Sequence, residues 1–302
     1  MKTKALLLLV FISAVRAQTP DTASTAPKPV VWPTDVRIEH DVAYLPGDRS
    51  DKADLYFPLV LPKARRVPAV VIIHGGGFND GDKGRPREIN IGHTLALHGF
   101  VGMSINYQLA KEKGVATWPQ PVYDAKASVR WLRKNAERLG LDPARIAVIG
   151  CSAGGNLAAI LALTGPRDEF DAASPYPEIS AAVCCAIDFY GAVDLLNYHD
   201  MKMFAKTRAE APELYRRASP ASYADAHGAP LLIVHGTADE TVALSQSETL
   251  AAALKRAGAP FEFVTIPGAP HTFDLEPKQR DLRPLVLAFL DRHFASAGVN
   301  AK

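Results

Sequence analysis

The sequence predicts an α/β protein built on a mostly parallel, doubly wound sheet, and three observations carry this prediction. Short runs rich in valine and isoleucine alternate with stretches of helical periodicity from about residue 69 onwards. The runs are apolar almost throughout, as expected of parallel strands that helices cover on both faces. Strands that alternate with helices are joined by right-handed crossovers, so they form one open sheet whose ligands bind beyond the carboxyl ends of the strands.

The first two strands are expected to form an antiparallel lead-in to this sheet. They cover residues 36–44 and 52–57, and the turn Pro46-Gly47-Asp48 lies between them. The remaining strands are the apolar runs at residues 69–73, 100–105, 145–149, 181–187, 230–234 and 261–266.

The helices have start and stop signals of their own. Residues 124–139 place apolar side chains on one face, and Gly140 follows as a terminating glycine. In the helix that begins at Ser245, Ser245 and Glu248 form a capping-box pattern, and Gly258 ends the helix. Two further helices are expected at residues 155–163 and 282–294.

One long stretch interrupts the alternation of strands and helices. Residues 191–228 separate two strands, and a connection of this length usually has a function or secondary structure of its own. We expect a small helical insertion over the functional site. No repeat, low-complexity tract or linker follows residue 34, so residues 35–297 are interpreted as a single domain.

The N-terminal residues have the pattern of a secretory signal peptide. Lys2 and Lys4 precede an apolar run at residues 5–14, which is too short to span a bilayer. Small residues follow, and cleavage is expected near Ala17–Gln18. Residues 1–17 are therefore predicted to direct export to the periplasm or the medium, with a buried N-terminal helix as the alternative. Residues 18–34 are rich in Thr, Pro, Ala and Ser and predict a flexible leader.

Composition excludes several classes of partner. The chain has 302 residues, of which 48% are hydrophobic and 22% charged, as in an ordinary globular protein. Its 34 Lys and Arg residues against 32 Asp and Glu residues leave a net charge of +2. Without a basic excess to meet phosphates, neither nucleic acid nor an anionic membrane is an expected partner, and no membrane span is expected. The sequence carries no signal for an oligomeric state.

The three cysteines are interpreted as small core residues. An odd number in an exported protein leaves at least one free thiol. Cys184 and Cys185 would point to opposite faces of a strand, which disfavours a bridge between them. Neither Cys151 nor this pair belongs to a Cys or His cluster of the kind that binds zinc, so no metal is expected.

A candidate nucleophile lies where a strand passes into a helix. The motif Gly150-Cys151-Ser152-Ala153-Gly154 follows the strand at residues 145–149 and opens the next helix. This GxSxG pattern builds a turn tight enough to lift the Ser152 hydroxyl above the sheet edge. The helix N-terminus beneath it supplies unpaired N–H groups and the positive end of the helix dipole.

A glycine-rich loop follows another strand end. It reads His74-Gly75-Gly76-Gly77-Phe78, and its glycines let the backbone approach a substrate closely. The N–H groups of this loop, together with that of Ala153, are candidates to bind a developing oxyanion. His74 precedes the serine strand and is interpreted as orienting the loop. The alternative is a flexible glycine turn without function.

Asp239 and His271 also come directly after strands. They fall at the same sheet edge as Ser152, and the order Ser, Asp, His is the one found in α/β-hydrolases. His271 is the candidate base and Asp239 its partner, with Glu240 as a competing acid. The other histidines are interpreted as structural or surface residues: His40, His93, His98, His199, His227, His235 and His293.

These motifs together resemble a known family. HGGGF, GCSAGG, HGTADETV and PGAPHTFD resemble the α/β-hydrolase carboxylesterases related to hormone-sensitive lipase. The likeness is greatest to the secreted bacterial branch similar to feruloyl and acetyl-xylan esterases, and it covers about residues 36–294. Two positions depart from the family pattern. At the position of Gln108 the family more often has Arg, and at the position of Cys151 it more often has a polar residue.

The resemblance implies an α/β-hydrolase fold and a set of site residues. Ser152, Asp239 and His271 would be the catalytic triad, and the N–H groups of Gly76, Gly77 and Ala153 would form the oxyanion hole. The pocket for the acyl group or the alcohol is expected to contain four aromatic residues, Phe78, Trp118, Tyr190 and Phe273.

The function expected is that of an exported serine esterase that works through an acyl-enzyme without metal or organic cofactor. Its substrate would be a short-chain acyl, acetyl or feruloyl ester, either a small molecule or linked to a polysaccharide. Two alternatives remain open. One is a serine peptidase of the prolyl-oligopeptidase type, and the other is a catalytically inactive binding module on the same fold.

Overall fold

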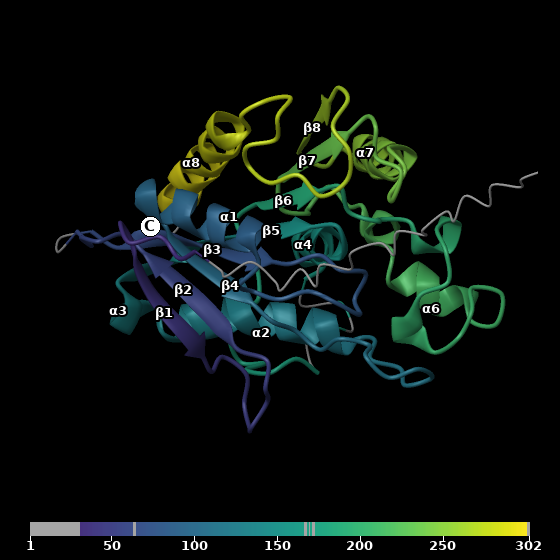
Figure 1. Cartoon of the computed structure of the whole chain (residues 1–302), viewed down its shortest axis with the longest axis horizontal. Helices are drawn as coiled ribbons and strands as arrows, with labels where there is room; N and C mark the ends of the chain where they lie inside the picture. The colour runs from purple at the N-terminus through teal and green to yellow at the C-terminus, as the bar shows by residue number, and fades with distance from the viewer. Residues whose placement is uncertain (1–30, 63–64, 166–167, 169, 171–172, 301–302) are drawn as a thin grey trace, which may run out of the picture. The chain divides into compact units, whose positions relative to one another are not determined.

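One eight-stranded sheet organises the computed structural model shown in Figure 1. The structure describes residues 31–300 apart from residues 63–64, 166–167, 169 and 171–172. The signal-peptide prediction for residues 1–17 and most of the leader prediction for residues 18–34 therefore lie outside the described residues.

The sheet has the expected parallel core with an antiparallel lead-in. Its strands are β1 (Arg37–Val42), β2 (Ala53–Phe57), β3 (Val67–Ile73), β4 (Val101–Ile105), β5 (Leu141–Cys151), β6 (Ala186–Phe189), β7 (Leu231–Gly236) and β8 (Phe261–Ile266). They follow the order β1-β2-β4-β3-β5-β6-β7-β8. β2 pairs antiparallel with β1 and β4, whereas every other neighbouring pair is parallel. The predicted fold class is confirmed.

Helices cover both faces of this sheet. They are α1 (Pro86–Leu97), α2 (Gln120–Lys134), α3 (Ala136–Leu139), α4 (Ala153–Leu163), α7 (Ser245–Ala257) and α8 (Arg283–Asn300). In β3, Val71 and Ile73 join the core that contains α2, α4 and α7, whereas Val70 and Ile72 join the core that contains α1 and α8. Successive side chains of a strand point to opposite faces, so a continuous apolar run fills both cores.

Helix α1 was not among the expected helices. Gly92 lies in its middle, and glycine disfavours a helix by about 1 kcal/mol relative to alanine. The tertiary structure requires this glycine, because a Cβ at position 92 would lie 2.6 Å from the ring of Tyr56 in β2. Close packing of the helix on the sheet therefore outweighs the weak local propensity.

The helix expected at residues 124–139 is broken in two. Asn135 separates α2 from α3, and its side-chain amide donates to the Trp131 carbonyl at 2.8 Å. Gly140 adopts a left-handed φ of 70° and ends α3, as predicted. The capping box at Ser245 was wrong: α7 begins after Leu244, and no side-chain cap hydrogen bond is formed.

The strand expected at residues 181–187 is displaced towards the functional edge of the sheet. β6 runs from Ala186 to Phe189 instead. The preceding segment is held by Arg133, whose guanidinium donates to the carbonyls of Ser180 and Ala182. Pairing with β5 begins only at Cys184, whose N–H donates to the Ile146 carbonyl at 2.9 Å, so the strand starts later than hydropathy alone suggests.

The insertion is helical, as expected. Its elements are η1 (Leu195–Asn197), η2 (Lys202–Phe204), α6 (Pro212–Arg217) and η3 (Pro220–Tyr223). The Tyr198 hydroxyl donates to the Thr241 carbonyl at 3.0 Å, which joins the insertion to the loop after β7. Within the described part of the chain, no helix is both long and apolar enough to cross a membrane.

Candidate active site

Ser152 lies at a sharp turn between β5 and α4. Its φ of 56° and ψ of −116° fall outside the regions that non-glycine residues usually adopt. The turn is tight because two glycines flank the serine. A Cβ at Gly150 would lie 1.9 Å from the Gly154 carbonyl oxygen, and one at Gly154 would lie 2.0 Å from the Ile73 carbonyl oxygen. Strain of this kind persists only where the surrounding structure enforces it, and it is typical of functional sites.

The structure brings Ser152, His271 and Asp239 into one hydrogen-bonded chain. The Ser152 Oγ lies 3.0 Å from His271 Nε2, and His271 Nδ1 lies 2.6 Å from Asp239 Oδ2. The Asp239 side chain is fully buried, whereas that of His271 is 11% exposed. A carboxylate only accepts hydrogen bonds, so Nδ1 of His271 carries the proton and Nε2 accepts from the serine hydroxyl. This is the arrangement that activates a serine nucleophile.

Sheet topology explains this convergence. Ser152 follows β5, Asp239 follows β7 and His271 follows β8, and β5 to β8 are consecutive parallel strands. Their carboxyl ends meet at one edge, so three residues far apart in sequence become neighbours there.

The glycine-rich loop lies against the nucleophile. A Cβ at Gly75 would come within 3.1 Å of the Ser152 Cβ, and one at Gly76 would lie 2.0 Å from the Asp80 carbonyl oxygen. Gly76 and Gly77 adopt φ values of 118° and 60°. Among the described residues, no acceptor takes a hydrogen bond from the N–H of Gly76, Gly77 or Ala153. Backbone donors without a protein partner beside a nucleophile are suited to an oxyanion.

The buried side chain of His74 is hydrogen-bonded to this loop. Its Nδ1 donates to the Gly75 carbonyl at 2.7 Å, and its ring stacks on Tyr107 with centroids 4.4 Å apart. Burial lowers the pKa of His74 to about 4, so the ring is neutral at pH 7. A Cβ at Gly81 would lie 2.1 Å from His74 Nδ1, so a glycine is required there for the loop to close over the ring.

The four aromatic residues expected in the substrate pocket are all buried. Phe78 is 1%, Trp118 8%, Tyr190 0% and Phe273 6% exposed. Trp118 packs edge-on against Phe204 of the insertion, with ring centroids 5.9 Å apart. Phe78 and Tyr190 expose almost no side-chain surface to a substrate in this structure. They therefore pack beneath the site and support it.

Tyr190 supports the loop that carries His271. Its ring meets the His271 imidazole edge-on at 4.7 Å, and its hydroxyl donates to the Phe273 carbonyl. The Arg87 guanidinium lies 3.4 Å from the same hydroxyl. The sequence marked Tyr190 as a site aromatic, but only the tertiary structure shows that it contacts the histidine.

Asp188, in β6, lies beneath the nucleophile turn. A Cβ at Gly155 in α4 would lie 2.2 Å from its Oδ1, which accepts the Gly191 N–H at 2.8 Å. Its Oδ2 has no partner among the described residues. Burial raises the pKa of Asp188 from 3.8 to about 7.

We expect the free energy of unfolding of Asp188→Asn, relative to that of the wild type, to increase as the pH rises from about 4 to about 7. The folded wild type keeps a proton that the unfolded chain has released, so its stability falls as the pH rises through this window. Asparagine retains the acceptor for Gly191 and does not ionise. Urea unfolding at several pH values measures the difference. Asp48→Asn is the exposed control, and a pH-independent difference at position 188 would contradict the burial argument.

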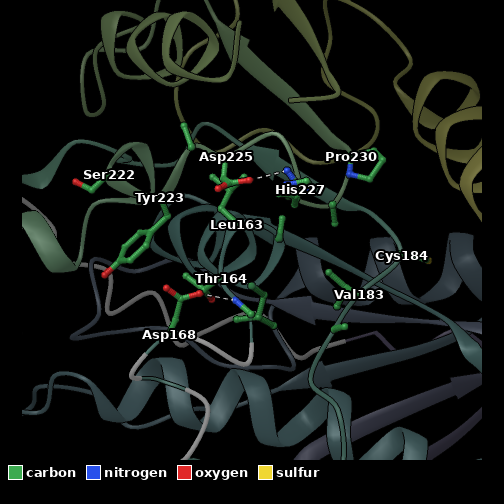
Figure 2. A pocket seen from close by; sticks show the side chains of 17 residues that line it. Leu163, Thr164, Asp168, Val183, Cys184, Ser222, Tyr223, Asp225, His227 and Pro230 are labelled. Carbon is green, nitrogen blue, oxygen red and sulfur yellow. Dashed lines mark hydrogen bonds between the residues drawn. The ribbon is translucent and has the colours of Figure 1, made fainter. Parts of the chain in front are cut away.

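A separate cavity of about 780 Å³ lies at the far end of α4 (Figure 2). Leu163 and Thr164 line it from the helix C-terminus, and Asp168, Asp225 and His227 lie around them. Ser152 precedes the opposite end of α4, so this cavity is not the space above the nucleophile.

In the described part of the chain, the three cysteines are free thiols. Cys151, Cys184 and Cys185 form no disulfide, and burial raises the pKa of the Cys151 thiol to about 12. Within the described residues, no group of three or more His, Cys, Asp or Glu side chains is placed to hold a metal ion.

A parallel sheet with Ser152, Asp239 and His271 at its carboxyl edge defines an α/β-hydrolase. Within that class, the chain belongs to the BD-FAE family, whose model matches residues 53–254. It is similar to the esterase LipQ of Mycobacterium tuberculosis, with 32% identity over 246 residues that cover 78% of this chain and 57% of LipQ. The chain thus spans somewhat more than half the length of the curated relatives it matches.

Two solved structures extend this likeness. A truncated carbohydrate esterase from gut microbiota has a TM-score of 0.79 and 25% identity, and the match covers 87% of this chain and 99% of that chain. Esterase Est2 of the Planctomycetes species Thermogutta terrifontis, bound to butyrate, has a TM-score of 0.69 and 27% identity. That match covers 86% of this chain and 94% of Est2. These findings confirm the family resemblance drawn from the motifs.

Proposed function

We propose that this protein is a serine esterase that hydrolyses carboxylic esters through an acyl-enzyme formed on Ser152. The observation that carries the proposal is the hydrogen-bonded chain from Ser152 Oγ through His271 to Asp239, assembled at the strained turn after β5. Related proteins named as esterases support the same chemistry.

The first half of the reaction transfers the acyl group to the enzyme. Ser152 Oγ attacks the ester carbonyl carbon while His271 Nε2 takes the hydroxyl proton. The carbonyl oxygen becomes an oxyanion, which the N–H groups of Gly76, Gly77 and Ala153 are positioned to bind. When the intermediate collapses, the bond to the alkoxy oxygen breaks, and His271 returns the proton to the departing alcohol.

The second half releases the acid. Water attacks the acyl carbonyl as His271 takes one of its protons. The new intermediate then collapses to a carboxylic acid as the bond to Ser152 Oγ breaks, and His271 returns the proton to that oxygen. Asp239 holds the imidazole in the Nδ1-protonated form and stabilises the imidazolium at each stage. None of these steps uses a metal or an organic cofactor.

We assign short-chain acyl, acetyl or feruloyl esters as the substrate class, free or attached to a polysaccharide. The butyrate bound by Est2 and the carbohydrate-esterase neighbour support this range. The test is hydrolysis of p-nitrophenyl acetate, butyrate and octanoate and of methyl ferulate. Turnover of the short esters supports the proposal. Cleavage of dipeptide amides in place of esters would favour a peptidase, and no turnover would favour an inactive module.

We also propose that residues 1–17 direct export, because basic, apolar and small residues follow one another as in a signal peptide. The expected mature N-terminus is Gln18. Mass spectrometry of the intact protein from the periplasm or the medium, after expression of the full chain, measures it. A product that stays in the cytoplasm with its first seventeen residues attached would refute export.

A further inference from the structure

A second histidine contacts the acid of the candidate triad. His235 lies in β7 and is fully buried. Its Nε2 lies 2.8 Å from the Val242 carbonyl oxygen and 3.2 Å from Asp239 Oδ2. Its Nδ1 lies 2.7 Å from the hydroxyl of Ser247, which is buried in the first turn of α7. Every polar atom of the His235 ring therefore has a partner.

The partners determine where the proton of His235 lies. A carbonyl only accepts hydrogen bonds, so Nε2 carries the proton that it donates to the Val242 carbonyl, and Asp239 Oδ2 lies 3.2 Å from the same nitrogen. Burial lowers the pKa of His235, which keeps the ring neutral at pH 7. Nδ1 then has a free lone pair and accepts from the Ser247 hydroxyl. Ser247 thus stabilises the tautomer that points an N–H at Asp239.

The contact adds a second imidazole beside the Asp239 carboxylate. Oδ1 accepts the N–H groups of Thr241 at 2.9 Å and Val242 at 2.8 Å. Oδ2 accepts from His271 at 2.6 Å and faces the His235 N–H at 3.2 Å. The two imidazoles therefore hold Oδ2 from two sides. Without His235, the carboxylate is restrained by the backbone contacts to Oδ1 and by His271, which is the ring that it has to orient.

We propose that His235 is a positioning residue for the candidate active site: its Nε2–H, oriented by Ser247, fixes the Asp239 carboxylate that orients His271. The inference rests on the proposed function, in which His271 is the base. His235 itself touches neither Ser152 nor a substrate, and its effect is transmitted through Asp239. Two tyrosines also lie beside the network formed by His235, Asp239 and His271. Tyr190 meets His271 edge-on, and the Tyr198 hydroxyl bonds to the Thr241 carbonyl.

Two substitutions separate the N–H donor from the ring that carries it. His235→Leu keeps a buried apolar volume and removes the donor. His235→Gln places a side-chain amide N–H at about the distance of the imidazole Nε2. We expect kcat to fall about 10- to 100-fold in His235→Leu with KM nearly unchanged, because misplacing a reacting group by about 1 Å has an effect of this size. His235→Gln should recover most of the wild-type kcat. His293→Leu, on α8, is the control for loss of a histidine.

A spectroscopic measurement tests the same inference without turnover. The proton between His271 Nδ1 and Asp239 Oδ2 should give a low-field NMR resonance in the full-length wild type, in Ser152→Ala and in His235→Gln. The resonance should broaden or vanish in His235→Leu, in which the carboxylate is less restrained. Circular dichroism and thermal unfolding establish that each variant is folded.

Three outcomes would overturn the positioning role. A folded His235→Leu variant with unchanged kcat and resonance shows that the donor is dispensable. A His235→Gln variant as impaired as His235→Leu shows that only the shape of the ring matters. If His235→Leu fails to fold, a folded His235→Gln variant that lacks the resonance shows likewise that an N–H donor at this position does not fix the carboxylate. If ester turnover persists in Ser152→Ala, the proposed function fails, while the resonance still decides the role of His235.

Discussion

Replacing Ser152 with alanine is expected to reduce ester turnover by about 10⁶-fold. Alanine removes the oxygen that would attack the ester, and neither His271 nor the loop glycines provide another nucleophile. The fold should be unaffected, because the only side-chain hydrogen bond of Ser152 in the described residues is the one to His271. Steady-state hydrolysis of p-nitrophenyl butyrate measures the loss, and thermal unfolding establishes that the variant is folded.

The matched control for this experiment is Ser245→Ala. Ser245 is exposed at the start of α7, and its side chain forms no capping hydrogen bond. This variant should keep wild-type turnover. Retention of wild-type turnover by purified Ser152→Ala would show that the nucleophile lies elsewhere.

Asp239→Asn is expected to lower kcat by up to about 10⁴-fold, with the protein still folded. An asparagine can present its NH₂ group to His271, and the imidazole then places its proton on Nε2. In that tautomer Nε2 no longer accepts the Ser152 proton. A change in the 2.6 Å contact between His271 and Asp239 therefore abolishes the hydrogen bond from Ser152 Oγ to His271 Nε2.

Glu240→Gln is the control for Asp239→Asn. The Glu240 side chain is exposed, whereas that of Asp239 is fully buried beside His271. Activity of Glu240→Gln should stay within about twofold of the wild type, as expected for a surface substitution away from the site. If Glu240→Gln caused the large loss and Asp239→Asn did not, Glu240 would be the acid of the triad.

Much of the sheet could be predicted because its central strands are buried on both faces. Continuous apolar runs marked the buried strands β3, β4, β5 and β7 directly, and the apolar run of β8 marked an edge strand that is only partly buried. The same signal failed for β6. Residues 181–185 are apolar, yet Arg133 binds the carbonyls of Ser180 and Ala182, and pairing with β5 begins only at Cys184. Hydropathy does not record which carbonyls a distant guanidinium will bind.

Helix boundaries depended on contacts that sequence patterns do not contain. Gly92 lowers the helical propensity of α1, but the Tyr56 ring leaves no room for a larger residue at that position. Asn135 interrupts what hydrophobic periodicity presents as one helix. In both places a packing contact or a side-chain hydrogen bond outweighed the local preference.

By itself, the sequence determined which residues follow the strands at the candidate site. Ser152, Asp239 and His271 each follow a strand, and parallel strands bring such positions to one edge. Tertiary structure alone decided which other groups surround them. His235 contacts Asp239 because the loop after β7 turns back on the strand, and Tyr190 meets His271 because the ends of β6 and β8 lie at one edge of the sheet. Periodicity and motif spacing indicate which element a segment forms, whereas the ends of elements and the hydrogen bonds between loops depend on distances that only the packed chain defines.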